Sequence, residues 1–304
     1  MTVRLFPAGA PAFPPLRTRA FLLQAALCCT SFATLSCGDT TQVRWAPPAE
    51  RIVSLVPSAT DVLLELGAAA RMAGRTDYDR DARIADVTSF GRTMSASSEA
   101  ILAQHPDLVI DASYAPWRVP AGLSEHAQVA TLTTDLQTFA DILALIDTIG
   151  VLVGEEQRAA ALRARLERDA ASMRAAAASI RPAVLYLVWA DPPRTISSTS
   201  YLSEVIELAG ARNAFPELEL AWPEISMEVI LQRDPDFIIV ASESPGIAED
   251  LRTMPVWMRL SAVKAGRVIE APNDLFHRPG PRMITAARWL RDALRKAQDP
   301  KGDA

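Results

Sequence analysis

Few side chains in this chain of 304 residues have the types and spacing that catalysis or metal binding requires. The three histidines, His105, His126 and His277, are far apart in the sequence and lack the spacing of zinc ligands. All three cysteines fall within the first 37 residues, which excludes a cysteine nucleophile or cysteine metal site from the rest of the chain. A Walker lysine motif, a G-x-G-x-x-G after a strand and a G-x-S-x-G motif are absent. The sequence therefore predicts a protein without catalytic residues, metal or cofactor.

Several aromatic residues fall in predicted loops, where they would be available to a ligand. Loops at the strand ends of open α/β sheets are where ligands bind, and aromatic side chains suit a large, flat, partly apolar molecule. The alternative is that each side chain packs its own loop onto the protein. Because they are spread over both halves of the chain, the group favours a ligand site. They are Tyr78, Phe90, Tyr114, Trp117, Trp222 and Phe276.

Two glutamates hold the same position in an internal repeat. Counted from Glu99 and from Glu228, residues 98–110 and 226–239 place an Ile-Leu pair, a Pro-Asp pair and an apolar strand at the same offsets. A repeat of this kind predicts two lobes of like topology. Each glutamate, preceded by Ser98 or Ser226 as a cap, would complement a helix dipole. The second interpretation is a matched pair of surface anions for arginines of a two-fold symmetric partner.

The elements that would position these residues follow an α/β pattern. An apolar run at 51–56 predicts a strand, and the helix after it is expected to be capped by Ser58 with Asp61 and to end at Gly67. Strands that alternate with helices indicate mostly parallel sheets covered on both faces. The other expected strands lie at 71–76, 107–112, 128–133, 183–190, 236–242 and 267–271.

A charged, alanine-rich stretch from Glu155 to Ile180 contains no glycine or proline, and Pro182 follows it. It predicts one helix of about 25 residues, or roughly 38 Å. The predicted fold class is α/β, with two Rossmann-like lobes at 51–154 and 182–304 bridged by one long rigid helix at 155–181.

The N-terminus predicts export. Arg17 and Arg19 precede an apolar run that is too short for a membrane span and fits a signal peptide. Residues 34–37, Thr-Leu-Ser-Cys, resemble a bacterial lipobox, so residues 1–37 are expected to be a lipoprotein signal with Cys37 lipidated and 38–50 a tether. The alternative is a plain signal peptide cleaved nearby. Net charge −5 argues against nucleic acid as a partner. The expected location is periplasmic or extracytoplasmic, with only a lipid in the membrane.

Four segments together resemble the cobalamin-binding members of the helical-backbone (class III) periplasmic binding proteins. The resemblance covers about residues 50–296, and its first segment is shared widely across class III, whereas the last is more characteristic of the corrinoid-binding branch. The segments are 51–61 (Arg-Ile-Val-Ser-Leu-Val-Pro-Ser-Ala-Thr-Asp), 99–110, 222–228 and 276–282 (Phe-His-Arg-Pro-Gly-Pro-Arg).

The resemblance implies a monomeric binding protein that holds a corrinoid between its lobes and delivers it to the permease dimer of an ABC importer. It implies that Glu99 and Glu228 dock on permease arginines and that Phe90 and Trp222 are corrin contacts, one per lobe. The remaining residues that it places beside the ligand pocket are Tyr78, Asp274, Phe276 and Arg278.

The sequence departs from the family at several of these positions. Phe90 stands in place of a tryptophan, Leu275 in place of another aromatic residue, and Trp117 and Trp189 have no obvious counterpart. The pocket is therefore expected to be remodelled.

Two alternatives stay open. On the same scaffold, a ferric siderophore would use pocket arginines, and haem would use a tyrosine or histidine ligand. An exported α/β enzyme is the other class. The candidate arginines are Arg92, Arg118, Arg194 and Arg278, and the candidate haem ligands are Tyr78, Tyr114 and His277.

Overall fold

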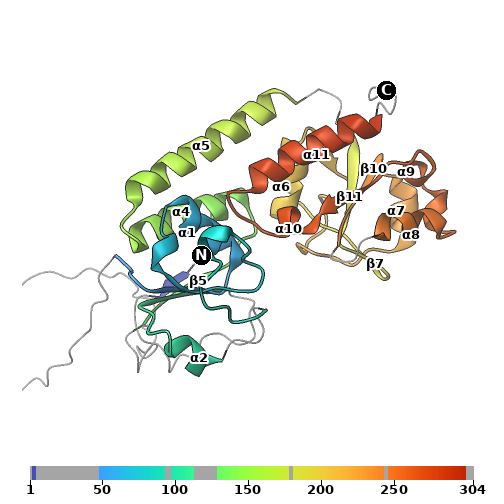
Figure 1. Cartoon of the computed structure of the whole chain (residues 1–304). Helices are drawn as coiled ribbons and strands as arrows, with labels where there is room; N and C mark the ends of the chain where they lie inside the picture. The colour runs from blue at the N-terminus through green and yellow to red at the C-terminus, as the bar shows by residue number, and fades with distance from the viewer. Residues whose placement is uncertain are drawn as a thin grey trace, which may run out of the picture.

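The computed structural model describes residues 2–4, 48–92, 97–112, 129–177, 181–242 and 246–298. Two α/β lobes lie side by side and the long helix α5 (Glu156–Ala175) runs from one to the other (Figure 1). This confirms the predicted fold class. Most of the predicted signal peptide and tether, including Cys37, lies outside the described residues.

The N-terminal lobe contains one sheet of order β1-β5-β4-β2-β3, parallel except for β1. Its predicted strands are found, each somewhat shorter or shifted by a residue or two. Strands and helices alternate along the chain, as a parallel sheet requires. The strands are β1 (Thr2–Arg4), β2 (Ile52–Ser54), β3 (Met72–Gly74), β4 (Leu108–Ala112) and β5 (Ala130–Thr134), and the helices are α1 (Pro57–Glu65), α2 (Ser98–Leu102) and α4 (Phe139–Leu152), with 3-10 turns η1 (Ala69–Arg71) and η2 (Ala82–Ile84).

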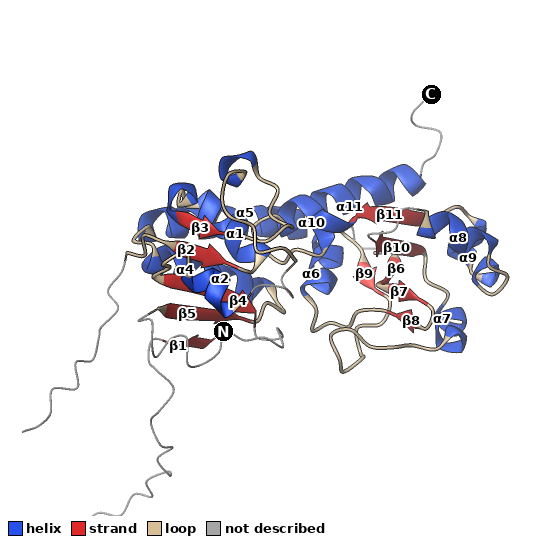
Figure 2. Ribbon diagram, turned by 60° about the horizontal axis from the view of Figure 1, so that its bottom comes forward, coloured by secondary structure: helices blue, strands red, loops and turns tan. Residues whose placement is uncertain are grey.

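The C-terminal lobe contains a parallel sheet of order β11-β10-β6-β9 and the short antiparallel pair β7-β8. Its strands are β6 (Ala183–Leu187), β7 (Trp189–Ala190), β8 (Pro193–Arg194), β9 (Arg212–Asn213), β10 (Phe237–Ser242) and β11 (Val268–Pro272). Its helices are α6 (Tyr201–Leu208), α7 (Met227–Arg233), α8 (Ile247–Thr253), α9 (Ser261–Lys264), α10 (Asn273–Phe276) and α11 (Met283–Gln298), with the 3-10 turn η3 (Trp257–Arg259). Figure 2 shows the two sheets as separate layers, one in each lobe.

The two lobes share one topology. When the parallel strands of each lobe are numbered by their order along the chain, both sheets have the spatial order fourth, third, first, second. These are β5-β4-β2-β3 in the N-terminal lobe and β11-β10-β6-β9 in the C-terminal lobe. The predicted repeat is the third strand of each lobe with its preceding helix, α2-β4 and α7-β10. The internal repeat therefore marks equivalent places in two equivalent folds.

The two copies of the repeat also share a backbone conformation and a pattern of aspartate hydrogen bonds. The residue six positions after each glutamate has a left-handed backbone, His105 with φ 49° and Asp234 with φ 40°. The aspartate of each Pro-Asp pair then accepts hydrogen bonds from the backbone at the start of the first strand of its lobe. Asp107 binds N–H groups just before β2, and Asp236 binds that of Ala183 at 2.7 Å. These bonds fix the register between the first and third strands.

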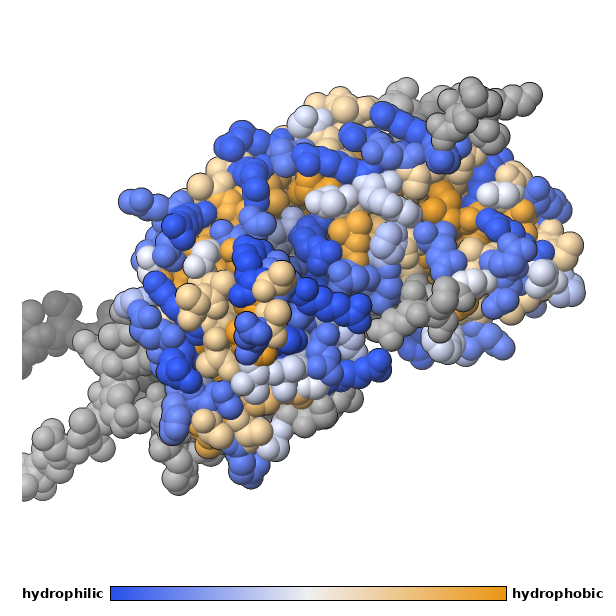
Figure 3. Space-filling view, viewed as in Figure 1, coloured by the Kyte–Doolittle hydropathy of each residue, from blue (hydrophilic) through white to orange (hydrophobic). Residues whose placement is uncertain are grey.

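The bridging helix packs on both lobes, on α4 in one and on α6 and α11 in the other. It spans 20 residues rather than about 25, and residues 178–180 lie outside the described part. A stripe at helical spacing is buried, consisting of Ala159, Leu162, Leu166, Ala170 and Met173. Because this stripe belongs to a core cluster with members in both lobes, the helix joins the lobes through continuous apolar packing. On the face shown in Figure 3, hydrophilic residues are interspersed with apolar patches in both lobes.

Candidate functional site

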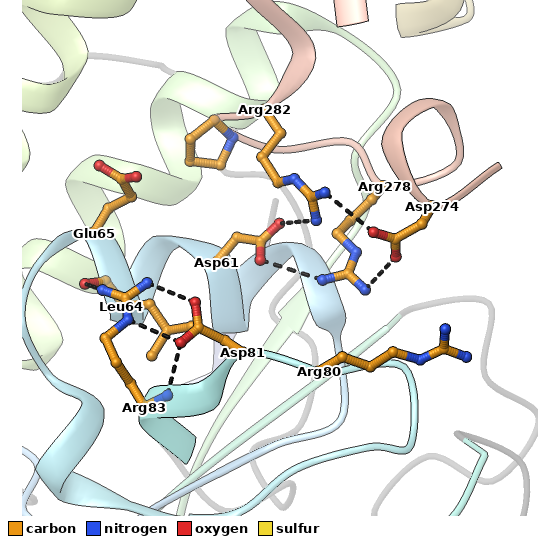
Figure 4. A pocket seen from close by; sticks show the side chains of 10 residues that line it. Asp61, Leu64, Glu65, Arg80, Asp81, Arg83, Asp274, Arg278 and Arg282 are labelled. Carbon is orange, nitrogen blue, oxygen red and sulfur yellow. Dashed lines mark hydrogen bonds and ion pairs between the residues drawn. The ribbon is translucent and has the colours of Figure 1, made fainter. Parts of the chain in front are cut away.

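A pocket of about 370 Å³ lies between the lobes, lined by residues of both. The N-terminal lobe contributes α1 and the loop before η2, and the C-terminal lobe contributes α10 and the connection to α11. Figure 4 shows that charged side chains of the two lobes point toward one another here. The lining residues are Asp61, Leu64, Glu65, Arg80, Asp81, Arg83, Asp274, Arg278, Pro281 and Arg282.

Arg278 is the centre of the contact between the lobes. Its residue is only 8% exposed, and its Nη1 donates to Asp61 Oδ1 at 3.2 Å. Its Nη2 donates to Asp274 Oδ1 at 2.7 Å and to the backbone carbonyl of Tyr78. Arg282 donates to Asp274 Oδ2 at 3.1 Å and lies 3.9 Å from Asp61 Oδ2. Two arginines of one lobe thus hold an aspartate of the other (Figure 4).

Asp61 does not cap its helix, contrary to the expectation from the sequence. Helix α1 begins at Pro57, and its N-cap residue, Val56, makes no side-chain cap bond. A proline at the first position suits a helix start without such a cap, because its fixed φ is already helical. The Asp61 carboxylate is therefore available to the other lobe.

Burial sets the electrostatics of this contact. It raises the pKa of Asp61, while the Arg278 and Arg282 guanidiniums oppose the shift. Burial likewise raises the pKa of Asp79, which is 2% exposed, against hydrogen bonds from the backbone and hydroxyl of Thr76. Asp61 Oδ2 and Asp79 Oδ1 are buried without a hydrogen bond from any described residue. The Arg278 guanidinium lowers the pKa of both carboxyls, and that of Arg282 adds to this at Asp61, so the arginines favour the charged forms.

Aromatic rings form a chain from the surface of the C-terminal lobe into its core. The indole of Trp222, 37% exposed, meets the His277 ring edge-on at 6.4 Å, and His277 meets Tyr186 at 6.1 Å. Tyr186 stacks on Phe276 at 6.2 Å. Phe276 is 1% exposed and also packs on Trp289, so its ring belongs to the core and not to the surface expected from the sequence. Trp222 and His277 are the surface members of this chain.

The two aromatic candidates of the N-terminal lobe that lie in the described residues, Tyr78 and Phe90, are half-buried. The Phe90 ring lies over Gly74, the last residue of β3, so closely that a Cβ at position 74 would come within 2.3 Å of it. The Tyr78 ring lies under the Arg92 guanidinium at 5.9 Å, and its backbone carbonyl binds Arg278. Tyr78, Asp274 and Arg278 are thus brought together, while Phe90 stands on a separate part of the same lobe.

The two repeat glutamates are exposed in equivalent positions, in the first turns of α2 and α7. Neither has an ion-pair partner among the described residues. Ser226 caps α7 as expected, whereas the cap of α2 is Ser97 and not Ser98, accepting from the Ala100 N–H at 3.1 Å. Tyr114, Trp117 and Arg118 lie outside the described residues.

Sequence reasoning missed three residues of the site. Arg282 belongs to the 276–282 segment that carries the resemblance, and Asp61 follows the carboxyl end of the first strand, where α/β ligands bind. The place of each of these two residues in the sequence could have indicated that it belongs to the site. His277 was considered only as a haem ligand, because nothing in the sequence shows that it lies against Trp222.

Within the described ranges, histidine, cysteine, aspartate and glutamate side chains form no group of three or more arranged to hold a metal ion. A search of the same residues finds no helix with the length and apolar character needed to cross a membrane.

Two like α/β lobes joined by one helix, meeting at a polar contact, define a two-lobe binding protein of the helical-backbone class. The chain belongs to the periplasmic binding protein family, which it matches over residues 52–275. Members of this family are extracytoplasmic transport proteins that bind a solute; they carry a ligand, not a cofactor.

Relatives and solved structures agree with this assignment. The chain is 26% identical over 253 residues to YvrC of Bacillus subtilis, an uncharacterized ABC transporter substrate-binding lipoprotein, covering 81% of this chain and 80% of the relative. It is 26% identical over 251 residues to a vitamin B12-binding protein of Pectobacterium atrosepticum, covering 79% and 87%. The periplasmic heme-binding protein RhuT from Roseiflexus has a similar structure, with TM-score 0.72, 25% identity and coverage of 82% and 99%.

Proposed function

We propose that this protein is the substrate-binding component of an ABC importer and that it binds cobalamin or a related corrinoid between its lobes. The observation that carries the proposal is one partly exposed aromatic surface in each lobe, Phe90 at the end of β3 and Trp222 with His277. A corrin is a broad, flat macrocycle with apolar faces and polar edges, which such rings bind by shape and contact. The similarity to a vitamin B12-binding protein supports the same ligand class.

Binding would need no covalent chemistry. Asp274 and Arg278 border the pocket and are already oriented by their own ion pair, so the polar edge of a ligand would meet fixed groups. Groups held in place before binding cost less entropy when the ligand arrives. The site is accordingly a binding site and not a reaction centre.

Haem is the second candidate ligand on this scaffold. His277 is an exposed imidazole beside Trp222, with its Nε2 3.2 Å from the Tyr186 hydroxyl, and an iron would have to compete with that contact. RhuT, which has a similar structure, is named a heme-binding protein. A ferric siderophore is less well supported, because two of the three described candidate arginines have other contacts. Arg278 binds Asp61, and Arg92 covers the Tyr78 ring.

The delivery step would use Glu99 and Glu228. They are exposed carboxylates at equivalent points of two equivalent lobes, which is the arrangement that a permease dimer with two-fold symmetry would recognise. A single monomer would present both anions at once. We infer that each glutamate pairs with an arginine of one permease subunit.

Charge reversal tests the docking role. We expect the double variant Glu99→Lys and Glu228→Lys to lose uptake in cells while its ligand affinity stays that of the wild type. The control is Glu156→Lys with Glu249→Lys, which makes the same charge change in the first turns of α5 and α8. Normal uptake by the first double variant, or equal loss in both, would refute the docking role.

The membrane connection is proposed to be a lipid on Cys37, which becomes the N-terminal residue when the signal before it is removed, with residues 38–50 as the tether. The relative YvrC is named a lipoprotein, which supports this. We expect Cys37→Ser to move the protein from the membrane fraction to the soluble fraction without changing ligand affinity. Unchanged fractionation would refute the anchor.

A ligand panel tests the proposed cargo. Residues 38–304 with Cys37 replaced would be titrated with cyanocobalamin, haem and a ferric siderophore, followed by calorimetry and visible absorbance. We expect one-to-one binding of the corrinoid. No corrinoid binding at about 100 µM, which corresponds to a free energy of about −5.5 kcal/mol, would remove the corrinoid proposal.

A further inference from the structure

A small antiparallel patch projects from the C-terminal lobe and is separate from the repeated fold. Strand β7 pairs with β8, and β8 in turn runs antiparallel to residues 221–225. The Thr195 N–H donates to the Pro223 carbonyl at 3.0 Å, and the Ile225 N–H donates to the Pro193 carbonyl at 2.9 Å. The hydrogen bonds therefore fix three segments as one continuous patch.

The register of this patch brings two tryptophans into the same small surface. Trp189 lies directly opposite Arg194, and Arg194 lies directly opposite Glu224. Residues directly opposite in antiparallel strands point to the same face, and so do residues two apart along an extended segment. Glu224 therefore lies on the face of Trp189, and Trp222, at a bend two residues before Glu224, belongs to the same patch.

Both tryptophans of the patch are exposed to water. Trp189 is 60% exposed and Trp222 is 37% exposed. The Trp189 indole N–H donates to the Asp191 carbonyl at 2.7 Å, so the ring is held in one orientation while its faces stay open. An exposed aromatic ring that is fixed in place loses little entropy on contact, as a preformed binding surface requires.

The patch continues the proposed ligand site. Its Trp222 contacts His277, and the next residue, Arg278, makes the contact between the lobes. Trp189 is separated from Trp222 by two strand spacings of about 4.8 Å across the patch and by two residue rises of about 3.3 Å along it. The distance between the two positions is therefore roughly 12 Å. A ligand group that reached Trp189 would therefore lie beyond a macrocycle seated on Trp222.

We propose that Trp189 is a further ligand contact, which stacks on an aromatic heterocycle carried on an arm of the transported macrocycle. Between the two indoles, Arg194 is half-exposed, and its loose pairing with Glu224 at 3.9 Å leaves it able to meet a phosphodiester in that arm. A corrinoid with a nucleotide arm has both groups. This inference rests on the proposed function. It extends that function by naming the part of the ligand that Trp189 contacts.

The test compares cobalamin with cobinamide, a corrinoid that lacks the nucleotide arm. For Trp189→Ala we expect cobalamin affinity to fall about tenfold, as for the loss of one base stacked on an aromatic ring, with cobinamide affinity unchanged. Trp189→Phe keeps a ring and should retain most of the affinity. Met258→Ala, which trims another exposed apolar residue of the same lobe, is the control and should change neither.

The outcomes separate this inference from the proposed function. Wild-type cobalamin affinity in Trp189→Ala, or an equal loss for both ligands, would overturn the role of Trp189 while leaving the corrinoid site in place. A wild-type protein that binds neither ligand would overturn the proposed function and the inference together.

Discussion

Replacement of Arg278 by alanine should weaken the protein far more than replacement of its neighbour Arg282. The Arg278 side chain is 9% exposed and that of its partner, Asp61, is 14% exposed. At 3.2 Å their attraction is about 5 kcal/mol for an effective dielectric constant of 20, a gross value from which the loss of hydration is subtracted. Removal of one member of a buried pair costs about 3–5 kcal/mol, because an uncompensated charge stays behind.

We expect the lower end of that range, about 3 kcal/mol, for Arg278→Ala, since Arg282 remains 3.9 Å from the Asp61 carboxylate. Arg282→Ala is the matched control. Its side chain is 39% exposed and its nearer partner, Asp274, is 58% exposed, so the loss should be below about 1 kcal/mol. The free energy of unfolding would be measured by urea denaturation at pH 7.

Two further measurements separate charge from packing. Adding Asp61→Ala to Arg278→Ala should restore much of the stability, because the Asp61 carboxylate is then no longer left buried without Arg278. The cost of Arg278→Ala should also shrink as the pH falls from 7 toward 4, since protonation of Asp61, whose pKa burial already raises, removes the same charge. If Arg278→Ala costs no more than Arg282→Ala, the reasoning about the lobe contact is wrong.

Asp79→Asn should stabilise the protein increasingly as the pH rises from 4 to 7. The pKa of Asp79 is raised above its ordinary value of 3.8, so the folded state holds a proton that the unfolded state has lost, and wild-type stability falls as that proton leaves. A difference in Tm that is constant over this range would contradict this. Gly74→Ala should push the Phe90 ring outward, because the new Cβ would lie 2.3 Å from its Cε2, and weaken cyanocobalamin binding at a cost of about 1 kcal/mol in stability. Calorimetric titration and urea denaturation of this variant would check both effects, and wild-type affinity would count against the placement of Phe90.

Much of the fold was predictable because short sequence patterns determine its strands and helices. Apolar runs bounded by turn residues gave the parallel strands, and the Pro-Asp pairs of the repeat mark the start of β4 and β10, where Asp107 and Asp236 fix the neighbouring strand. The bridging helix followed from a stretch rich in alanine and charge. Its end was placed too late because helix formers continue past Ala175, and composition alone does not show where packing stops.

The site was less predictable because its contacts join residues far apart in the sequence. Asp61 and Arg278 are 217 positions apart, and the local pattern around Asp61 favoured a cap. The position of Phe276 at a strand end did not show which way its ring faces, and the structure puts it in the core. The similarity of the lobes, by contrast, correctly predicted that Glu99 and Glu228 occupy equivalent places.

The central claim is that one aromatic surface from each lobe holds the ligand, and cyanocobalamin titration of Phe90→Ala and Trp222→Ala tests it most directly. Each lost ring contact should remove about 1.5 kcal/mol, or about tenfold in affinity, with one ligand bound per chain. Wild-type affinity in both variants would contradict the account, because a corrinoid that needs neither ring does not lie between them.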